Sequence, residues 1–375
     1  MRPILPTASC SSIRSFPSFT TALHLSPQAR CHLSSNSNPS RRLALLQLGT
    51  VIPQAQLLGV GTKFAGAQES LIETNTNGSF IRVSPTVSEE GAADWVKKDK
   101  RRMLHAVCCV GDLDRTIEFY TECLGMTLLR RRDIPEERFS NAFVGYGPED
   151  SHFAIELTYN YGVDKYEVGT GFGHFGIAVA DVSKTLDLIK AKRGKVIKEP
   201  GPIEGSSSMV AFIEDPDGYK FKLMERKLTP EPLCQVMLQV GDIDRSVGFY
   251  EKAFGMELLH KKENPAYKVS MTDNLSLVLY SSATMGYGPE DRNAVLELRY
   301  NYGVTDYDKG NAYVQIAIGT DDVYKTAEAV NLFGGKITRE PGPLPGLATK
   351  ITVCLDPNGW KSAFVDNKDF DKELQ

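Results

Sequence analysis

The chain has 375 residues, 41% hydrophobic side chains and a formal net charge of −4. This length allows one or two ordinary domains with a sizeable core, and the hydrophobic content is typical of soluble globular proteins. The part expected to fold has no basic stretch that would by itself argue for nucleic-acid binding. The seven cysteines show no C-x-x-C spacing or disulfide framework, which favours a reducing compartment.

The N-terminal segment has an unusual charge composition. Residues 1–68 contain five arginines, one lysine and many serines, while Glu69 is the first acidic residue. Such a composition is typical of an organelle-import segment. The excess of serine over arginine favours the chloroplast over the mitochondrion, and a twin-arginine signal at Arg41–Arg42 is a further alternative. We predict a disordered transit segment over residues 1–68 and a linker over residues 69–101.

The apolar stretch Leu43–Val60 comes nearest to a membrane-spanning segment. It is short for a spanning helix, and Gln47 and Pro53 are among the residues that interrupt it. We therefore expect no membrane association.

The remainder of the chain contains an internal repeat. The motif at Gly111–Arg115 recurs at Gly241–Arg245 with an offset of 130, and the motif at Gly145–Asp150 recurs at Gly286–Asp291 with an offset of 141. Repeats of this kind indicate duplicated structural units. The change in offset gives the second half eleven extra residues between positions 265 and 285, which either lengthen a hairpin or reflect a faulty gene model.

Within the first half, a pattern of strand, helix and strands occurs twice. The predicted elements are a strand at Leu104–Val110, a helix opened by Asp112, strands at Phe153–Tyr159 and Phe175–Val179, a helix at Val182–Lys192, and a hairpin of Val210–Ile213 with Tyr219–Met224. We predict an α+β fold of four βαβββ modules in two duplicated halves. The halves are residues 102–226 and 232–366, joined by a link at 227–231 and followed by a tail at 367–375.

Four runs of the first half resemble glyoxalase I, from the vicinal-oxygen-chelate superfamily. They are Phe119–Met126, Glu156–Tyr166, Gly171–His174 and Glu214–Lys220, and the similarity extends through both halves. The resemblance implies lactoylglutathione lyase activity, in which the hemithioacetal of methylglyoxal and glutathione is isomerised to S-D-lactoylglutathione. It also implies one divalent metal ion, Ni or Zn, glutathione as co-substrate, and sites that take two metal ligands from each half.

The resemblance places metal ligands at four equivalent positions in each half. Site A would combine His105, Glu156, Gln315 and Ala363, and site B would combine Gln235, Glu297, His174 and Lys222. In the family, the fourth position is a glutamate that serves as both metal ligand and general base. Neither site has this glutamate, so the catalytic candidates are Glu156, Glu297 and the substituted base position, Lys222.

The substitution at Lys222 changes the electrostatics of site B. A lysine in place of a glutamate raises the local charge by two units beside a dication, which weakens metal binding. One hypothesis is that the ammonium group takes the metal position and pairs with Glu297. Site A keeps an imidazole, a carboxylate and an amide oxygen, a donor set that can hold Zn, Ni or Mg, and Glu156 is its only evident base.

Strand alternation identifies candidates for substrate binding, because residues two and four positions from a ligand share its face. Cys109 and Gln239 occupy the position where the family has an arginine that contacts glutathione. Asn160 and Asn301 match the family's glutathione-contacting asparagine. Arg299 lies on the same face and adds a positive charge.

Two further functions are weighed against the glyoxalase I activity. The first is a catalytically weak or inactive relative that binds glutathione conjugates, which the residues Lys222, Ala363 and Cys109 favour. The second is an extradiol dioxygenase, which needs two histidines and one carboxylate at a single iron site, a set that neither site provides. Because fusion of the halves completes both sites within one chain, we expect a monomer.

Overall fold

The computed structural model describes residues 72–74, 80–82, 88–192, 194–202, 208–227, 229–271, 274–344 and 348–375. The predicted transit segment lies outside the described residues, as does the apolar stretch within it. The described residues all belong to one compact unit. Among them, no helix has both the length and the apolar character needed to cross a membrane.

The element order repeats in the two halves. Before the first half come β1 (Ile72–Thr74), β2 (Phe80–Arg82) and α1 (Glu89–Lys98). The first half contains β3 (Met103–Cys109), α2 (Leu113–Glu122), β4 (Thr127–Ile134), the 3-10 helix η1 (Pro135–Glu137), β5 (Phe139–Gly145), β6 (Ala154–Asn160), β7 (Phe172–Val179), α3 (Val182–Ala191), β8 (Lys195–Pro202), β9 (Met209–Glu214) and β10 (Lys220–Glu225). The second half contains β11 (Leu233–Gln239), α4 (Ile243–Phe254), β12 (Glu257–Met271), β13 (Asn274–Gly286), β14 (Val295–Asn301), β15 (Tyr313–Thr320), α5 (Val323–Leu332), β16 (Lys336–Pro343), β17 (Lys350–Leu355), β18 (Lys361–Asp366) and α6 (Asn367–Glu373).

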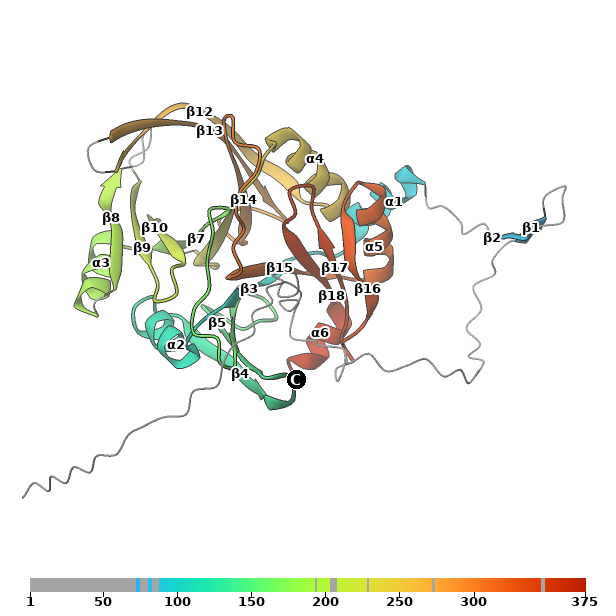
Figure 1. The fold of residues 1–375 in the computed structure, drawn as a ribbon, viewed down its shortest axis with the longest axis horizontal. Coiled ribbons are helices and arrows are strands. Elements are labelled where there is room, and N and C mark those ends of the chain that lie inside the picture. Colours follow the sequence, from blue (N-terminus) through green and yellow to red (C-terminus); the bar gives the residue numbers. More distant parts are fainter. Residues whose placement is uncertain are drawn as a thin grey trace, which may run out of the picture. The chain divides into compact units, whose positions relative to one another are not determined.

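Each half contributes one module to each of two eight-stranded sheets. One sheet has the strand order β12-β13-β14-β11-β7-β10-β9-β8, and the other has the order β16-β17-β18-β15-β3-β6-β5-β4. The halves meet where β11 pairs antiparallel with β7 and where β15 pairs antiparallel with β3. Figure 1 shows α3 beside β8 and α5 beside β16. The predicted α+β fold of four βαβββ modules is confirmed.

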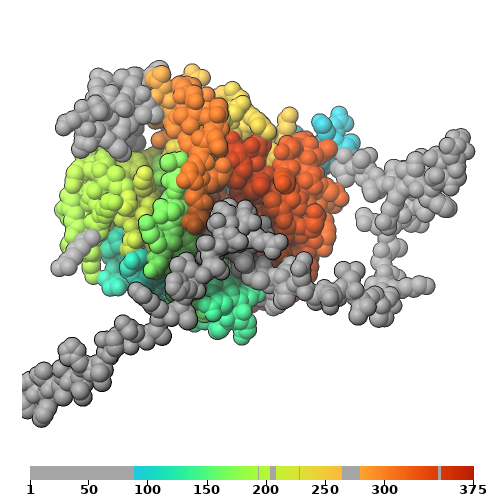
Figure 2. Space-filling view, viewed as in Figure 1, coloured from blue at the N-terminus to red at the C-terminus, as the bar shows by residue number. Residues whose placement is uncertain are grey.

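The segments that precede β7 and β15 also join the halves. The backbone N–H of Thr170 donates to the carbonyl of Asp308 at 2.7 Å, and that of Ala312 donates to the carbonyl of Glu167 at 3.1 Å. Figure 2 shows first-half residues in green beside second-half residues in orange on the viewed face. The two halves therefore pack as one body in this unit.

In every module, an aspartate caps the N-terminus of the helix. Asp112, Asp181, Asp242 and Asp322 each accept a hydrogen bond from a backbone N–H in the first turn of the helix that follows. Such a cap satisfies one of the donors that a helix N-terminus leaves free. The repeated Gly-Asp motif is therefore a structural signal, and it fixes where α2 and α4 begin.

The turn between β9 and β10 is tied to α2 by a buried hydrogen bond. The Tyr120 hydroxyl donates to Asp215 Oδ2 at 2.8 Å, and Asp215 Oδ1 accepts from the backbone N–H of Tyr219. Gly218 has φ of +94°, which the turn requires and glycine adopts without strain. Burial raises the pKa of Asp215 to about 7. The Asp-Pro-Asp-Gly turn is therefore part of the core.

The structure adds detail at two segments of the second half. Residues 257–286 form a hairpin of 15- and 13-residue strands, where the first half has strands of 8 and 7, so the extra residues lengthen a hairpin. The expected tail, residues 367–375, contains α6, whose Phe370 is buried. The sequence of this segment has no apolar periodicity that would predict a helix. The short helix is stabilised by its packing on β18.

Candidate metal and substrate sites

Site A lies on four adjacent strands that come from both halves. The order β18-β15-β3-β6 places Ala363, Gln315, His105 and Glu156 on neighbouring strands of one sheet. Ala317 pairs in register with both Ala363 and His105. The structure therefore brings together the four positions that the resemblance implied, two from each half.

The carboxylate of Glu156 is held by two side chains. His105 Nε2 lies 3.2 Å from Glu156 Oε2, and Asn141 Nδ2 donates to Glu156 Oε1 at 2.7 Å. Burial acts to raise the pKa of Glu156, but the His105 ring and the Asn141 amide outweigh it and hold the pKa below its ordinary value. Glu156 is therefore an oriented carboxylate that is ionised at neutral pH.

The donors of site A fit a divalent metal ion. Two ligand atoms that each lie about 2.1 Å from one ion are about 3 Å apart at the usual coordination angles, which matches the His105–Glu156 distance. Gln315 Oε1 is buried and has no hydrogen-bond partner among the described residues. Among the described residues, no group of three or more His, Cys, Asp or Glu side chains is placed to hold a metal ion. Site A is not such a group, because its third donor, Gln315, is an amide. Ala363 contributes no donor.

Helix α6 closes one side of site A with apolar and aromatic groups. The ring centroid of Phe370, on α6, lies 6.4 Å from that of His105. On another side, the ring of Phe143, from β5, meets His105 edge-on at 5.2 Å. Phe370 belongs to an apolar cluster that includes Ala363. Glu373 anchors the helix through Arg130 Nη1 at 3.1 Å, and it also pairs with Arg132. The fourth ligand position of site A is therefore packed against hydrocarbon.

Sequence reasoning missed one carboxylate near site A. Glu149 is buried and pairs with Arg130 Nε at 2.6 Å, and its Oε2 has no hydrogen-bond partner among the described residues. Burial raises the pKa of Glu149 to about 7, and the nearby His105 opposes this rise. The signal was available, because Glu149 belongs to the repeated hexapeptide at residues 145–150, to which no role was given.

Site B lies on the equivalent strands of the other sheet. The order β10-β7-β11-β14 places Lys222, His174, Gln235 and Glu297 on neighbouring strands. Gly176 pairs in register with both Lys222 and Gln235, as Ala317 does in site A. The four positions of site B also come together from both halves.

Glu297 is bound by neutral and cationic donors. Its Oε1 accepts from Arg299 Nη2 at 3.0 Å, its Oε2 accepts from Gln235 Nε2 at 2.7 Å, and His174 Nε2 lies 3.9 Å from Oε2. Lys222 forms no ion pair with this carboxylate within the described part of the chain. The hypothesis of a direct Lys222–Glu297 pair therefore does not describe this structure, because Arg299 holds the carboxylate instead.

The charges of site B disfavour a metal ion. Burial acts to raise the pKa of Glu297, but Arg299, Lys222 and His174 lower it to about 2. Burial and the Lys222 charge lower the pKa of His174 to about 3, so this imidazole is neutral at pH 7. Two cations already face one carboxylate, and both carboxylate oxygens have donors. A dication does not fit this arrangement.

The candidate substrate positions pair within each half. Asn160 Nδ2 lies 3.8 Å from Cys109 Sγ and donates to the Tyr166 hydroxyl at 2.8 Å. In the second half, Asn301 Nδ2 donates to Gln239 Oε1 at 3.3 Å. Burial raises the pKa of Cys109 to about 12, so its thiol stays protonated at neutral pH. Both asparagines are thus positioned by neutral groups.

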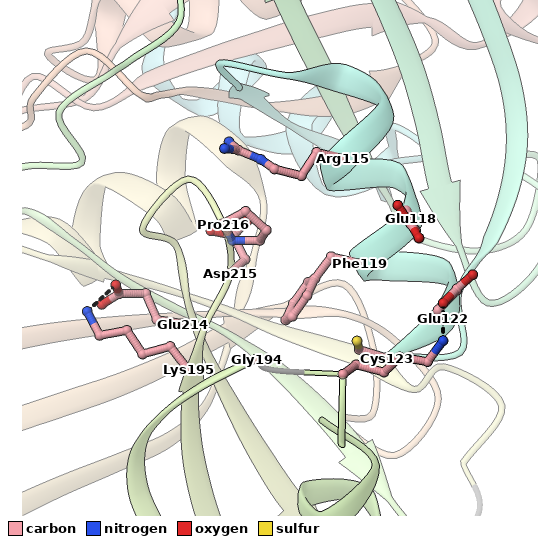
Figure 3. A pocket seen from close by; sticks show the side chains of 11 residues that line it. Arg115, Glu118, Phe119, Glu122, Cys123, Gly194, Lys195, Glu214, Asp215 and Pro216 are labelled. Carbon is pink, nitrogen blue, oxygen red and sulfur yellow. Dashed lines mark hydrogen bonds and ion pairs between the residues drawn. The ribbon is translucent and has the colours of Figure 1, made fainter. Parts of the chain in front are cut away.

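Figure 3 shows a separate pocket between α2 and the β8–β9 region. Its volume is about 490 Å³. The charges on its rim neutralise each other, because Lys195 pairs with Glu214 at 2.5 Å and Lys192 pairs with Glu122. No residue of site A or site B lines this pocket. It is therefore not the candidate site.

Comparison with known proteins agrees with the two-half architecture. The model of the Glyoxalase/Bleomycin resistance protein/Dioxygenase superfamily matches residues 102–223 and 233–364. An Arabidopsis thaliana protein named "Probable lactoylglutathione lyase, chloroplastic" is 66% identical over 328 residues, which cover 86% of this chain and 89% of the relative. A lactoylglutathione lyase of Oryza sativa subsp. japonica is 61% identical over 80% of this chain and 99% of the relative.

Solved structures and shorter relatives give the same assignment. The crystal structure of glyoxalase I from Zea mays is 62% identical, with a TM-score of 0.71, and the match covers 75% of this chain and 98% of that one. A lactoylglutathione lyase of Escherichia coli O157:H7 is 52% identical over 34% of this chain and 93% of its own length, so it corresponds to one half. The chloroplast location expected from the N-terminal composition agrees with the name of the Arabidopsis relative. The chain therefore belongs to the glyoxalase family, together with the two-half lactoylglutathione lyases of plants.

Proposed function

We propose that this chain is a chloroplast glyoxalase I that isomerises the methylglyoxal–glutathione hemithioacetal to S-D-lactoylglutathione at site A. The observation that carries the proposal is the donor set of His105, Glu156 and the unpartnered Gln315 oxygen, which converge from both halves. The names of the plant relatives supply the reaction. The charges favour site A over site B, where Arg299 and Lys222 face the carboxylate of Glu297.

The three donors of site A would hold one divalent ion, Ni or Zn, which supplies electrophilic polarisation of two neighbouring substrate oxygens when bound. Glu156 accepts the proton from one carbon and returns it to the next, and its low pKa keeps it ionised for the first transfer. Asn141 holds the carboxylate in one orientation. Phe143 and Phe370 exclude water around His105, so the transferred proton is retained.

The glutathione part of the substrate is expected at the paired asparagine positions. Asn160, held by Tyr166, offers an amide that can bind a peptide group of glutathione near site A. Because each site combines strands of both halves within one chain, the functional unit is a monomer. A sedimentation experiment checks this, and a stable dimer at micromolar concentration would contradict it.

A second function, that of a weakly active or inactive protein that binds glutathione conjugates, is favoured by one observation. Ala363 and Lys222 leave both sites without the fourth carboxylate, and the space beside Ala363 is packed with the apolar cluster that includes Phe370. In that case the chain would bind S-D-lactoylglutathione without forming it.

Steady-state isomerisation of the hemithioacetal by the full chain loaded with Ni or Zn separates these functions. Glu156→Gln is expected to lower kcat by roughly a hundredfold or more, because it removes the proton acceptor. Glu118→Gln, at an exposed carboxylate on α2, is the matched control. If the parent chain binds the conjugate by calorimetry but shows no turnover, the second function holds; if Glu297→Gln rather than Glu156→Gln removes turnover, site B is catalytic.

A further inference from the structure

Two arginines of β4 lie on the face of the sheet that carries site A. Arg130 pairs in register with Phe143, and Phe143 pairs with Glu156. Two residues further along β4, Arg132 pairs with Asn141, whose amide donates to Glu156. Alternate residues of a strand share a face, and paired residues of neighbouring strands do so too. Both arginines therefore belong to the same face as the carboxylate of site A.

Arg132 lies between the metal position and the asparagine expected to bind glutathione. Glu156, Thr158 and Asn160 share one face of β6. Thr158 pairs with Asn141, which is the register partner of Arg132. Four residues of a strand span about 13 Å, and an extended tripeptide spans about 10 Å. A glutathione conjugate that reaches from Glu156 to Asn160 therefore passes the row of residues that contains Arg132.

Helix α6 supplies a carboxylate to both arginines. Glu373 Oε1 lies 2.5 Å from Arg132 Nη2 and 3.1 Å from Arg130 Nη1. Its Oε2 accepts a hydrogen bond from Thr349 Oγ1 at 2.9 Å. Within the described residues, Arg132 forms an ion pair with Glu373 alone, whereas Arg130 also pairs with Glu149 at 2.6 Å. Arg132 is thus the arginine that loses its counter-ion when Glu373 moves away.

The contact between α6 and Arg132 can be exchanged for another carboxylate. Helix α6 has seven residues, a length that is not stable without packing. Lys350 pairs with Asp369 and anchors the start of the helix, so only its last turn has to move. The side chains of Arg132 and Glu373 keep 27% and 17% of their surface exposed, and an ion pair that water reaches is weak. The position already binds one carboxylate, so its chemistry suits a second.

We propose that Arg132 is a specificity-determining residue of site A that binds a carboxylate of the glutathione part of the substrate, and that Glu373 occupies this position until the substrate replaces it. The guanidinium supplies the positive charge that Cys109 lacks. Arginine suits this role because its planar group binds a carboxylate through two donors. The inference rests on the proposed function for the identity of the ligand.

Calorimetric titration of the full chain with S-methylglutathione, a conjugate that cannot be isomerised, tests the role of Arg132. Arg132→Met is expected to weaken binding roughly tenfold or more, because a charge-assisted hydrogen bond is lost. Arg132→Lys keeps the charge and should weaken binding less. Arg131→Met is the matched control, because this neighbouring arginine points to the other face, where it pairs with Asp114, and binding should be unchanged.

Glu373→Gln tests the exchange of carboxylates. It removes the competing charge, so S-methylglutathione should bind roughly threefold to tenfold more tightly. In the Arg132→Met background the same substitution should give no gain, because the arginine that it frees is absent. A gain that persists there would mean that α6 obstructs site A by its bulk alone, which contradicts the exchange. Circular dichroism of each variant establishes that it is folded.

Steady-state kinetics separate this inference from the proposed function. In a chain that isomerises the hemithioacetal, Arg132→Met should raise KM and leave kcat largely unchanged. A parent chain that binds S-methylglutathione through Arg132 but shows no turnover contradicts the proposed reaction and supports the inference. The inference is overturned if folded Arg132→Met binds S-methylglutathione like the parent chain, or if the parent chain does not bind this conjugate.

Discussion

Sites A and B share one template and one strand arrangement, yet their electrostatics differ. In site A the carboxylate of Glu156 is bound by an imidazole and an amide, and an unpartnered amide oxygen remains. In site B the carboxylate of Glu297 is bound by a guanidinium and lies near a lysine. The ligand positions are therefore equivalent in space. The charges differ, because Arg299 and Lys222 would repel a dication in site B, whereas a dication in site A would face the carboxylate of Glu156.

The largest expected effect comes from Lys222→Glu, which would remove a cation from site B and add the missing carboxylate. We expect the variant to bind a second nickel ion per chain and to raise turnover roughly a hundredfold, the usual contribution of a general base. Metal analysis and steady-state kinetics measure this. An unchanged metal content would show that Arg299 alone is enough to exclude the ion.

Helix α6 distinguishes site A from site B through Phe370. Phe370→Ala removes a buried ring beside His105 and is expected to lower the free energy of unfolding by about 3 kcal/mol, or to release α6 and expose site A. Denaturant unfolding and hydrogen exchange of residues 367–375 measure the two outcomes. Tyr324→Ala, at an exposed aromatic on α5, is the control, and equal effects of both substitutions would contradict the assigned role.

The stability near site A should depend on pH through Glu149. Its pKa is raised from 4.5 to about 7, so its contribution to stability is complete below pH 4.5 and is lost as the pH rises through 7. The loss is at most about 3 kcal/mol. Glu149→Gln should therefore reduce the fall in unfolding free energy between pH 5 and pH 8. Glu290→Gln is the matched variant in the other half, and a parent-like slope in Glu149→Gln would refute the assignment.

The smallest expected effect concerns the helix caps, which test whether the two halves are equally stable away from sites A and B. Asp112→Ala and Asp242→Ala remove the same helix cap from α2 and α4, and each should lower the unfolding free energy by about 1 kcal/mol. Thermal and denaturant unfolding would measure both losses. A clear inequality would mean that the halves differ in stability as well as in electrostatics.

Much of the fold was predictable because its signals are local or repeated. The aspartate caps, the alternating strands and the two offsets indicate four modules, and the resemblance places the ligand positions on strands from both halves. The same positions identify the missing carboxylates at Lys222 and Ala363. These features depend on residue type and spacing, which one sequence contains in full.

Only the tertiary structure decided which side chains share each site. It placed Arg299, rather than Lys222, against Glu297, and it brought Phe370 beside His105 and Glu149 against Arg130 from distant parts of the chain. Side-chain rotamers and the docking of a seven-residue helix depend on packing between elements, not on local periodicity. The sequence by itself thus determined the modules and the positions of both sites, while the packing determined the charge partners that separate a metal-binding site from a cation-filled one.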